Sequence, residues 1–354
     1  YAHSSFGPLP AFLTGWLLFL TRFITYAALI NLLITYLAVF SPWFLQPSSR
    51  IISIVFITIL LAFINHVGVK NSTRFNNVLT IAKLIPLFLF IIVGLFYIEP
   101  ANFEVKEVPG FSSFSSTVLL LVFAFGGFES VLVNSGEVKN PAKNLPFALL
   151  LATTIIAILY VLIQTVSIGT LPTIGSSDKP LAEAAGLFIG KTGATIIAIG
   201  ALFSITGTLN AIMLVGSRVP FALSEQQQFL IVYSYVHPIF NTPTWWLLLF
   251  MSITILVSIT NSFLYAATIS AIIRIMIYAI VCIALIKLRK KRADQTGYFK
   301  VRYGKAVAIV GLLITFWLLS SSKINEIRDV SIASAVGLII YFVFEQYKKR
   351  KNEH

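Results

Sequence analysis

Long uninterrupted runs of apolar residues are the feature that most constrains how this chain folds. The hydrocarbon core of a lipid bilayer is about 30 Å thick, and roughly 20 apolar residues in an α-helix can cross it. Several stretches reach this length. The chain is 57% hydrophobic and 11% charged, whereas soluble domains are about one quarter charged. Because the runs are continuous rather than alternating, they argue against a β-barrel and predict an all-α, polytopic membrane protein.

We predict ten membrane spans, with boundaries defined to within a few residues. No low-complexity tract and no soluble domain fits between them, so residues 1–354 are interpreted as a single membrane domain. The short link at Asn261 implies that the two helices around it form an antiparallel pair. The predicted spans are residues 11–40, 50–69, 77–98, 114–135, 146–170, 192–222, 244–260, 262–288, 304–321 and 329–346.

The net charge of +13 comes mainly from Lys and Arg beside these spans, which indicates membrane topology rather than nucleic-acid binding. If residue 1 is cytosolic, the loops on that side hold about three times as many basic residues as the other loops. The positive-inside rule then predicts a basic cytosolic loop at 287–305 and a cytosolic tail at 347–354. The cluster Lys287–Arg292 either marks a helix end or binds anionic membrane lipid.

The span at 114–135 is interrupted by two adjacent glycines, Gly126 and Gly127, and by Glu129. A glycine costs about 1 kcal/mol relative to alanine in a helix. The pair indicates a helix that unwinds inside the membrane, unless it serves close helix packing. Unwound backbone offers N–H groups to a carboxylate and carbonyl groups to an ammonium, which suits an amino acid. Two roles are open to Glu129, gating or pinning neighbouring helices by hydrogen bonds.

Other polar residues inside the spans also indicate function. Lys83 either extends to the cytosolic edge or carries a proton, since burial disfavours a charged ammonium. Ser204 and Thr208 share one helix face and either contact Lys83 or substrate, or bond their own backbone. Arg22 and Arg274 need buried partners, and Tyr26, one turn after Arg22, could line a pocket. The single cysteine, Cys282, excludes an internal disulfide.

The run FAFGGFESVLVNSGEVKNPAKNLP, residues 123–146, resembles the sixth transmembrane helix and following loop of the amino acid–polyamine–organocation (APC) permeases. Gly-Phe-Glu, Gly-Glu-Val-Lys-Asn-Pro and Asn-Leu-Pro carry the match. YAHSSFGPLPAFLTGWLLFLTRF resembles the entry to the family's third helix, TIAKLIPLFLFIIVG its fifth and GTLNAIMLVGSRVPFAL its eighth. The ten spans then correspond to helices three to twelve.

The resemblance implies an inverted repeat of two five-helix units, with substrate bound at broken helices near the midplane of the cytoplasmic membrane. It implies secondary amino acid transport rather than catalysis. In family members with lysine at the position of Lys83, the ammonium is thought to stand where sodium sits in related transporters. This supports Lys83, with Ser204 and Thr208, as the proton-coupling group. Phe123 and Phe125 either close over the substrate or simply pack. The expected substrate-binding residues are Phe123, Ala124, Phe125, Gly126, Gly127 and Tyr26.

The family's first two helices have no counterpart here, and the first of them normally carries a second glycine-rich break. We therefore interpret the sequence as an N-terminally truncated fragment of a longer permease, with a degenerate gene or a non-transporting sensor or scaffold as alternatives. Exchange without proton coupling also stays open. The substrate is not fixed, and small neutral amino acids are favoured. No motif indicates an enzyme, a cofactor or a metal site. The segment SPWFLQPSS lacks the cysteine that a disulfide-linked heavy chain would need.

Overall fold

The computed structural model describes residues 2–67, 69–104, 108–129, 138–217, 237, 242–260, 262–291 and 302–352. Every regular element in this part of the chain is helical, as the composition predicts. Seven of these helices are long and apolar enough to cross a membrane. They are α2 (Pro8–Leu37), α3 (Pro47–His66), α4 (Val69–Gly94), α7 (Pro141–Thr170), α9 (Lys191–Gly216), α12 (Phe263–Lys291) and α14 (Ile324–Asn352).

The three other predicted spans coincide with shorter apolar helices among the described residues. These are α5 (Phe111–Phe125), α11 (Thr244–Thr260) and α13 (Gly304–Ser320). The predicted span at 114–135 continues past α5, but its residues 130–135 lie outside the described part of the chain. So do residues 292–301 of the predicted basic loop.

The sequence did not reveal α8 (Pro180–Ile189), a helix in the connection before α9. Its 10 residues are too few to cross a bilayer, so it gives no membrane-length signal. Gly190, with a φ of 75°, separates it from α9, and glycine adopts this conformation readily. The short α1 (Ala2–Phe6) was also missed. The 3₁₀ helices are η1 (Pro42–Leu45), η2 (Leu95–Tyr97), η3 (Pro100–Phe103) and η5 (Ile174–Ser176).

Proline marks where several helices begin. It lacks the N–H that would be unsatisfied in the first turn, and its fixed φ already suits a helix. α2, α3, α7 and α8 each begin at a proline. Pro86, in contrast, lies inside α4. An internal proline removes the hydrogen bond to the carbonyl four residues earlier, so α4 lacks one backbone bond beside Lys83.

One compact unit comprises Tyr1–Thr25, Pro109–Leu151 and Leu264–His354. Its core lies along α12, where the buried side chains between Ile269 and Ile277 pack against residues of α2, α5, α13 and α14. Two tryptophans add hydrogen bonds between its helices. Trp16 Nε1 donates to the Ala333 carbonyl at 2.9 Å, and Trp317 Nε1 donates to Ser115 Oγ at 3.1 Å.

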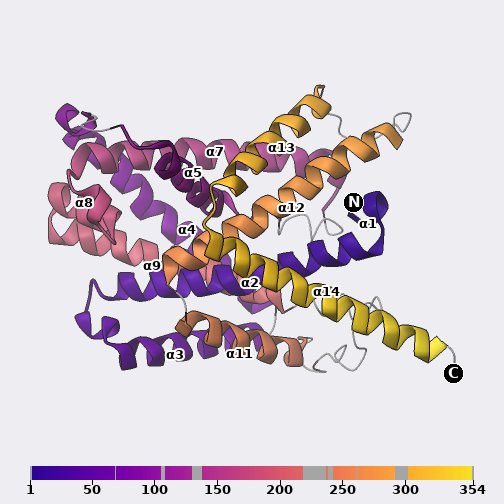
Figure 1. Ribbon diagram of the computed structural model, residues 1–354. Coiled ribbons are helices and arrows are strands. Elements are labelled where there is room, and N and C mark those ends of the chain that lie inside the picture. The colour runs from indigo at the N-terminus through magenta and orange to yellow at the C-terminus, as the bar shows by residue number, and fades with distance from the viewer. Residues whose placement is uncertain are drawn as a thin grey trace. The chain divides into compact units, whose positions relative to one another are not determined.

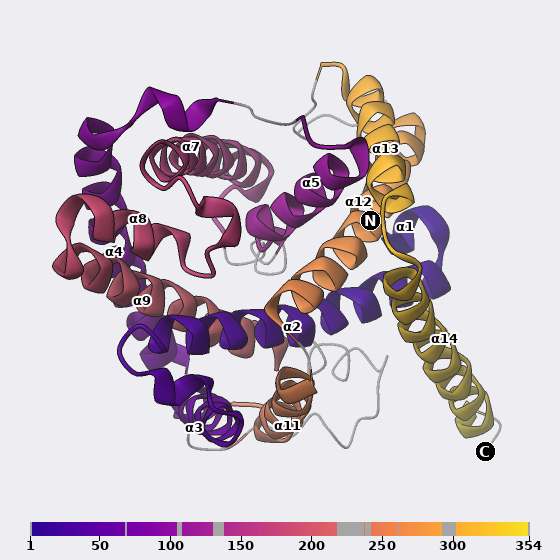
Figure 2. The ribbon, with the colours of Figure 1, turned by 60° about the vertical axis from the view of Figure 1, so that its left-hand side comes forward.

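A second compact unit comprises Tyr26–Val108 and Ala152–Phe263. Within it α3 and α11 lie side by side (Figure 1), and α9 runs beside α4 and α8 (Figure 2). Glycines on α9 permit the close approach. A Cβ at Gly200 would overlap the ring of Pro86, and a Cβ at Gly207 would lie 3.3 Å from Leu79 Cβ.

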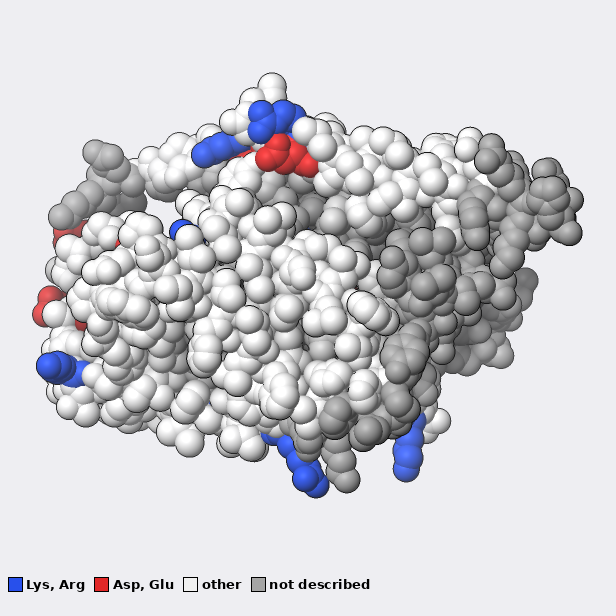
Figure 3. Space-filling model, turned by 90° about the horizontal axis from the view of Figure 1, so that it is seen from below, with Lys and Arg blue, Asp and Glu red and all other residues white. Residues whose placement is uncertain are grey.

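Large apolar side chains remain exposed on several helices. Phe56 on α3 is 65% exposed, Ile85 on α4 69% and Phe316 on α13 75%. One face of the molecule is mainly uncharged among its described residues, with Lys, Arg, Asp and Glu in a few small groups (Figure 3). Exposed large apolar side chains and a scarcity of charge fit contact with lipid rather than with water.

Candidate functional site

Helix α5 ends at the paired glycines. Its last helical residue is Phe125, and Gly126 is extended, with φ −69° and ψ 157°. Gly127 has a φ of 116°, a conformation that residues with a side chain rarely adopt. Gly126 N–H still donates to the Phe123 carbonyl at 3.1 Å. The backbone therefore leaves the helix at Gly126 and Gly127. The segment beyond Glu129, residues 130–137, lies outside the described part of the chain.

The carboxylate of Glu129 fills the space beside this break. One oxygen, Oε2, accepts a hydrogen bond from Gly127 N–H at 2.9 Å. The other, Oε1, forms an ion pair with Arg274 Nη1 on α12, and the two side chains are 11% and 3% exposed. Gly126 leaves room for this pair, because a Cβ there would lie 2.5 Å from Arg274 Nη1.

Arg274 also reaches hydroxyl groups on two helices. Its Nε donates to Ser270 Oγ at 3.4 Å, and its Nη2 donates to Thr25 Oγ1 at 3.3 Å. Thr25 and Ser270 hydrogen-bond to each other at 2.8 Å. Arg22, one turn before Thr25 on α2, is only 4% exposed. The structure gives Arg22 no hydrogen bond among the described residues, and Glu129 and Arg274 are the charges that act on it.

The aromatic residues expected at the break differ in their surroundings. Phe123 is half-buried and packs against the core of the first unit. Phe125 is also half-buried, and Ala124 between them is exposed. Tyr26 belongs to the second unit, where it is fully buried. Its hydroxyl donates to Thr58 Oγ1 at 3.2 Å, and its ring meets Phe250 edge-on at 6.3 Å.

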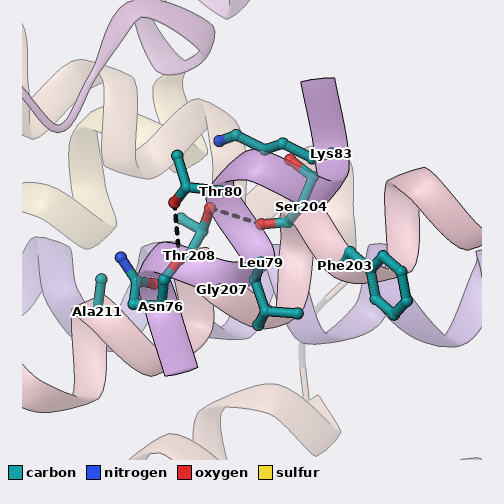
Figure 4. Close-up of a pocket in the computed structure, with 9 residues that line it drawn as sticks. All are labelled: Asn76, Leu79, Thr80, Lys83, Phe203, Ser204, Gly207, Thr208 and Ala211. Atoms are coloured by element: carbon teal, nitrogen blue, oxygen red, sulfur yellow. Dashed lines mark hydrogen bonds between the residues drawn. The ribbon is translucent and has the colours of Figure 1, made fainter. Parts of the chain in front are cut away.

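Lys83, Ser204 and Thr208 meet at one pocket between α4 and α9 in the second unit (Figure 4). The pocket has a volume of about 130 Å³. Lys83 is half-buried, and it has no hydrogen bond or ion pair among the described residues. The full lining is Asn76, Leu79, Thr80, Lys83, Phe203, Ser204, Gly207, Thr208 and Ala211.

Asn76 and Thr80 are lining residues that our sequence reading missed. They precede Lys83 by seven and three positions on α4, and residues at this spacing share one helix face. The same periodicity, applied backward from Lys83, would have found them.

Two histidines, His66 and His237, lie together in the second unit. The rings of His66 and His237 are 5.2 Å apart and edge-on, and the Thr242 hydroxyl donates to the His66 carbonyl at 3.2 Å. Within the described residues, no group of three His, Cys, Asp or Glu side chains is placed to hold a metal ion.

Long apolar helices, a helix that ends at two glycines and charged groups inside the spans together define a multi-pass membrane transport protein. Comparison with known protein families identifies the class of transport protein. The family model described as "Amino acid permease" matches residues 1–344, and the chain belongs to that family. The protein is a permease of the APC group, which moves amino acids or related solutes across a membrane and is not an enzyme.

Several curated relatives come from Bacillus subtilis (strain 168). The methylthioribose transporter is 29% identical over 98% of this chain and 78% of its own length. The branched-chain amino acid permease BcaP is 27% identical over 100% of this chain and 80% of its own length. The serine/threonine exchanger SteT is 30% identical over 86% of this chain and 70% of its own length.

Proposed function

We propose that this permease is a proton-coupled symporter of small neutral amino acids that works by alternating access. The observation that carries the proposal is Lys83, an intramembrane ammonium in a polar pocket with no acidic partner among the described residues. An unpaired charge within a membrane span is costly and is usually functional. Its ability to lose a proton is the property that proton coupling requires.

Substrate would be held at the end of α5, by the backbone groups of Gly126 and Gly127 and by the ring faces of Phe123 and Phe125. The charges beside the break support a neutral substrate. Glu129 already pairs with Arg274, so its carboxylate is not free to bind a cationic side chain. The names of two relatives, a branched-chain amino acid permease and a serine/threonine exchanger, support the same class.

Uptake by the protein in liposomes tests the proposal. Labelled leucine, serine or alanine should accumulate when the outside is made acidic, and accumulation should disappear when a protonophore collapses the gradient. The Lys83→Met variant should lose gradient-driven accumulation altogether, since methionine has similar length and no proton to carry. Undiminished accumulation in this variant would refute proton coupling through Lys83.

Exchange is the second candidate function, favoured by the relative SteT, which is named as an exchanger. An exchanger would take up labelled amino acid only when liposomes are preloaded with unlabelled amino acid. Its uptake would not respond to the proton gradient, and Lys83→Met would leave it intact.

A further inference from the structure

The pocket beside Lys83 continues along α4 past the residues assigned to proton coupling. Asn76, Thr80 and Lys83 form one stripe that covers about 10 Å of helix length at 1.5 Å per residue. Ser204, Thr208 and Ala211 form the facing stripe on α9. Gly207 lies between these two stripes, and a Cβ there would be 3.4 Å from Asn76 Oδ1. The pocket therefore leads from Lys83 toward the N-terminal end of α4.

The hydroxyl groups of Thr80 and Thr208 present acceptors rather than donors to this pocket. Thr80 Oγ1 donates its hydrogen to the Asn76 carbonyl at 2.8 Å, and Thr208 Oγ1 donates to the Ser204 carbonyl at 2.9 Å (Figure 4). A hydroxyl has one hydrogen to donate and two lone pairs. Only the lone pairs of these two hydroxyl groups remain for the pocket, and they suit an ammonium, a water molecule or a hydronium ion.

The pocket offers water, but no carboxylate, to accept a proton from Lys83. No Asp or Glu is among its described lining residues. Its volume of about 130 Å³ exceeds what one water molecule needs, about 30 Å³ of liquid volume, so several waters fit. Thr80 is exposed and Asn76 half-buried, so the pocket is not sealed along this stripe.

We infer that this pocket is the path by which Lys83 exchanges its proton with water at the N-terminal end of α4, and that Asn76 and Thr80 position the water that carries it. The ammonium of Lys83 gives a proton to a pocket water, which leaves a neutral amine and a hydronium ion. Thr80 and then the Asn76 side-chain amide accept hydrogen bonds from successive waters. The inference rests on the proposed proton symport, and the proposed topology makes this end cytosolic.

Measuring net uptake and counterflow side by side separates proton release from substrate movement. Net uptake requires each carrier cycle to release its proton inside the liposome. Counterflow, in which labelled substrate exchanges for unlabelled substrate at equal pH, lets the carrier return loaded and protonated. A variant that impairs only proton release therefore lowers net uptake relative to counterflow. A variant that is simply misfolded lowers both equally.

The test uses Thr80→Val and Asn76→Leu, which remove the acceptors with little change in volume. We expect each to lower the ratio of net uptake to counterflow by about tenfold, which is less than the roughly 10²–10⁴-fold contributed by a group that itself transfers the proton. Thr80→Ser, which keeps a hydroxyl, should restore the ratio. Thr165→Val is the matched control, because Thr165 also donates to the carbonyl four residues earlier at 2.8 Å but lies outside the pocket.

A wild-type ratio in both Thr80→Val and Asn76→Leu would overturn the inference, as would an equal loss of net uptake and counterflow. If the proposed proton symport itself is wrong, the transport measurements would give a different result. The wild-type protein would then show counterflow without any gradient-driven uptake, and the inference would fall with the symport on which it rests.

Discussion

At the scale of single residues, Glu129 uses both of its carboxylate oxygens at once. Oε1 pairs with Arg274, and Oε2 accepts from the backbone of Gly127. One side chain thus joins the end of α5 to α12. Arg22 is buried close enough for both charges to act on it. The carboxylate of Glu129 therefore acts on two buried guanidinium groups, which stay protonated in proteins.

This shared charge predicts that Glu129→Gln is more damaging than Arg274→Met. Removing the carboxylate leaves two buried guanidinium groups without a counter-charge, whereas removing Arg274 leaves Glu129 with Arg22. Loss of one partner of a buried pair costs about 3–5 kcal/mol, and we expect Glu129→Gln near the top of that range. Thermal unfolding in detergent would measure both variants and the double variant.

Arg328→Gln provides the control for these variants. Arg328 pairs with Asp329 at 2.8 Å, but its side chain is 62% exposed, and exposed pairs contribute little to stability. Additive losses in the double variant Glu129→Gln/Arg274→Met would show that the two side chains do not depend on each other.

At the scale of elements, the packing of α4 against α9 depends on Gly200 and Pro86. A Cβ at Gly200 would lie 2.9 Å from Pro86 Cβ and closer still to Pro86 Cγ. A proline ring cannot swing aside as a flexible side chain can. The two helices must therefore separate if residue 200 gains a side chain.

We expect Gly200→Ala to destabilise the protein by about 1–3 kcal/mol, the usual cost of overpacking. Gly186→Ala in α8 should be neutral or stabilising, because the added Cβ would lie at 3.7 Å from Ala194 Cβ and alanine favours a helix by about 1 kcal/mol over glycine. Melting temperatures of the two variants in the same detergent would test this. A lower melting temperature for Gly186→Ala than for Gly200→Ala would contradict it.

The helices also show how much of the structure could be predicted from the sequence alone. Continuous apolar length predicted a helix at every proposed span, because crossing a bilayer leaves few other folds. It could not predict α8, which is too short to carry that signal. Glu129 and Arg274 each stood out as charges inside spans, but they are separated by 145 positions, and no local periodicity connects them. The family resemblance, not the spacing in the sequence, predicted one proton-coupling group of Lys83, Ser204 and Thr208.

At the scale of the whole molecule, neither compact unit is a continuous piece of sequence. α2, α7 and α12 each contribute residues to both units, with divisions at Thr25–Tyr26, Leu151–Ala152 and Phe263–Leu264. These three divisions fall within a helix or at its first residue, whereas the fourth, Val108–Pro109, falls in the loop before α5. Cutting the chain at a loop would therefore remove part of both units.

The orientation of the chain in the membrane is a prediction at this scale, made from its basic loops. In a Cys282→Ala background, Arg302→Cys should react with a membrane-impermeant maleimide only in inside-out vesicles. Ser176→Cys, in the exposed segment before α8, should react only in right-side-out vesicles. The reverse pattern would place the loop at 287–305 outside the cell.

The contact between Pro86 and Gly200 also restricts the order in which this protein can change over time. The proline ring and any side chain at position 200 would claim the same volume. A lineage that enlarges residue 200 while Pro86 is present passes through a destabilised intermediate. Two positions on different helices, 114 apart in the chain, therefore constrain each other's substitutions.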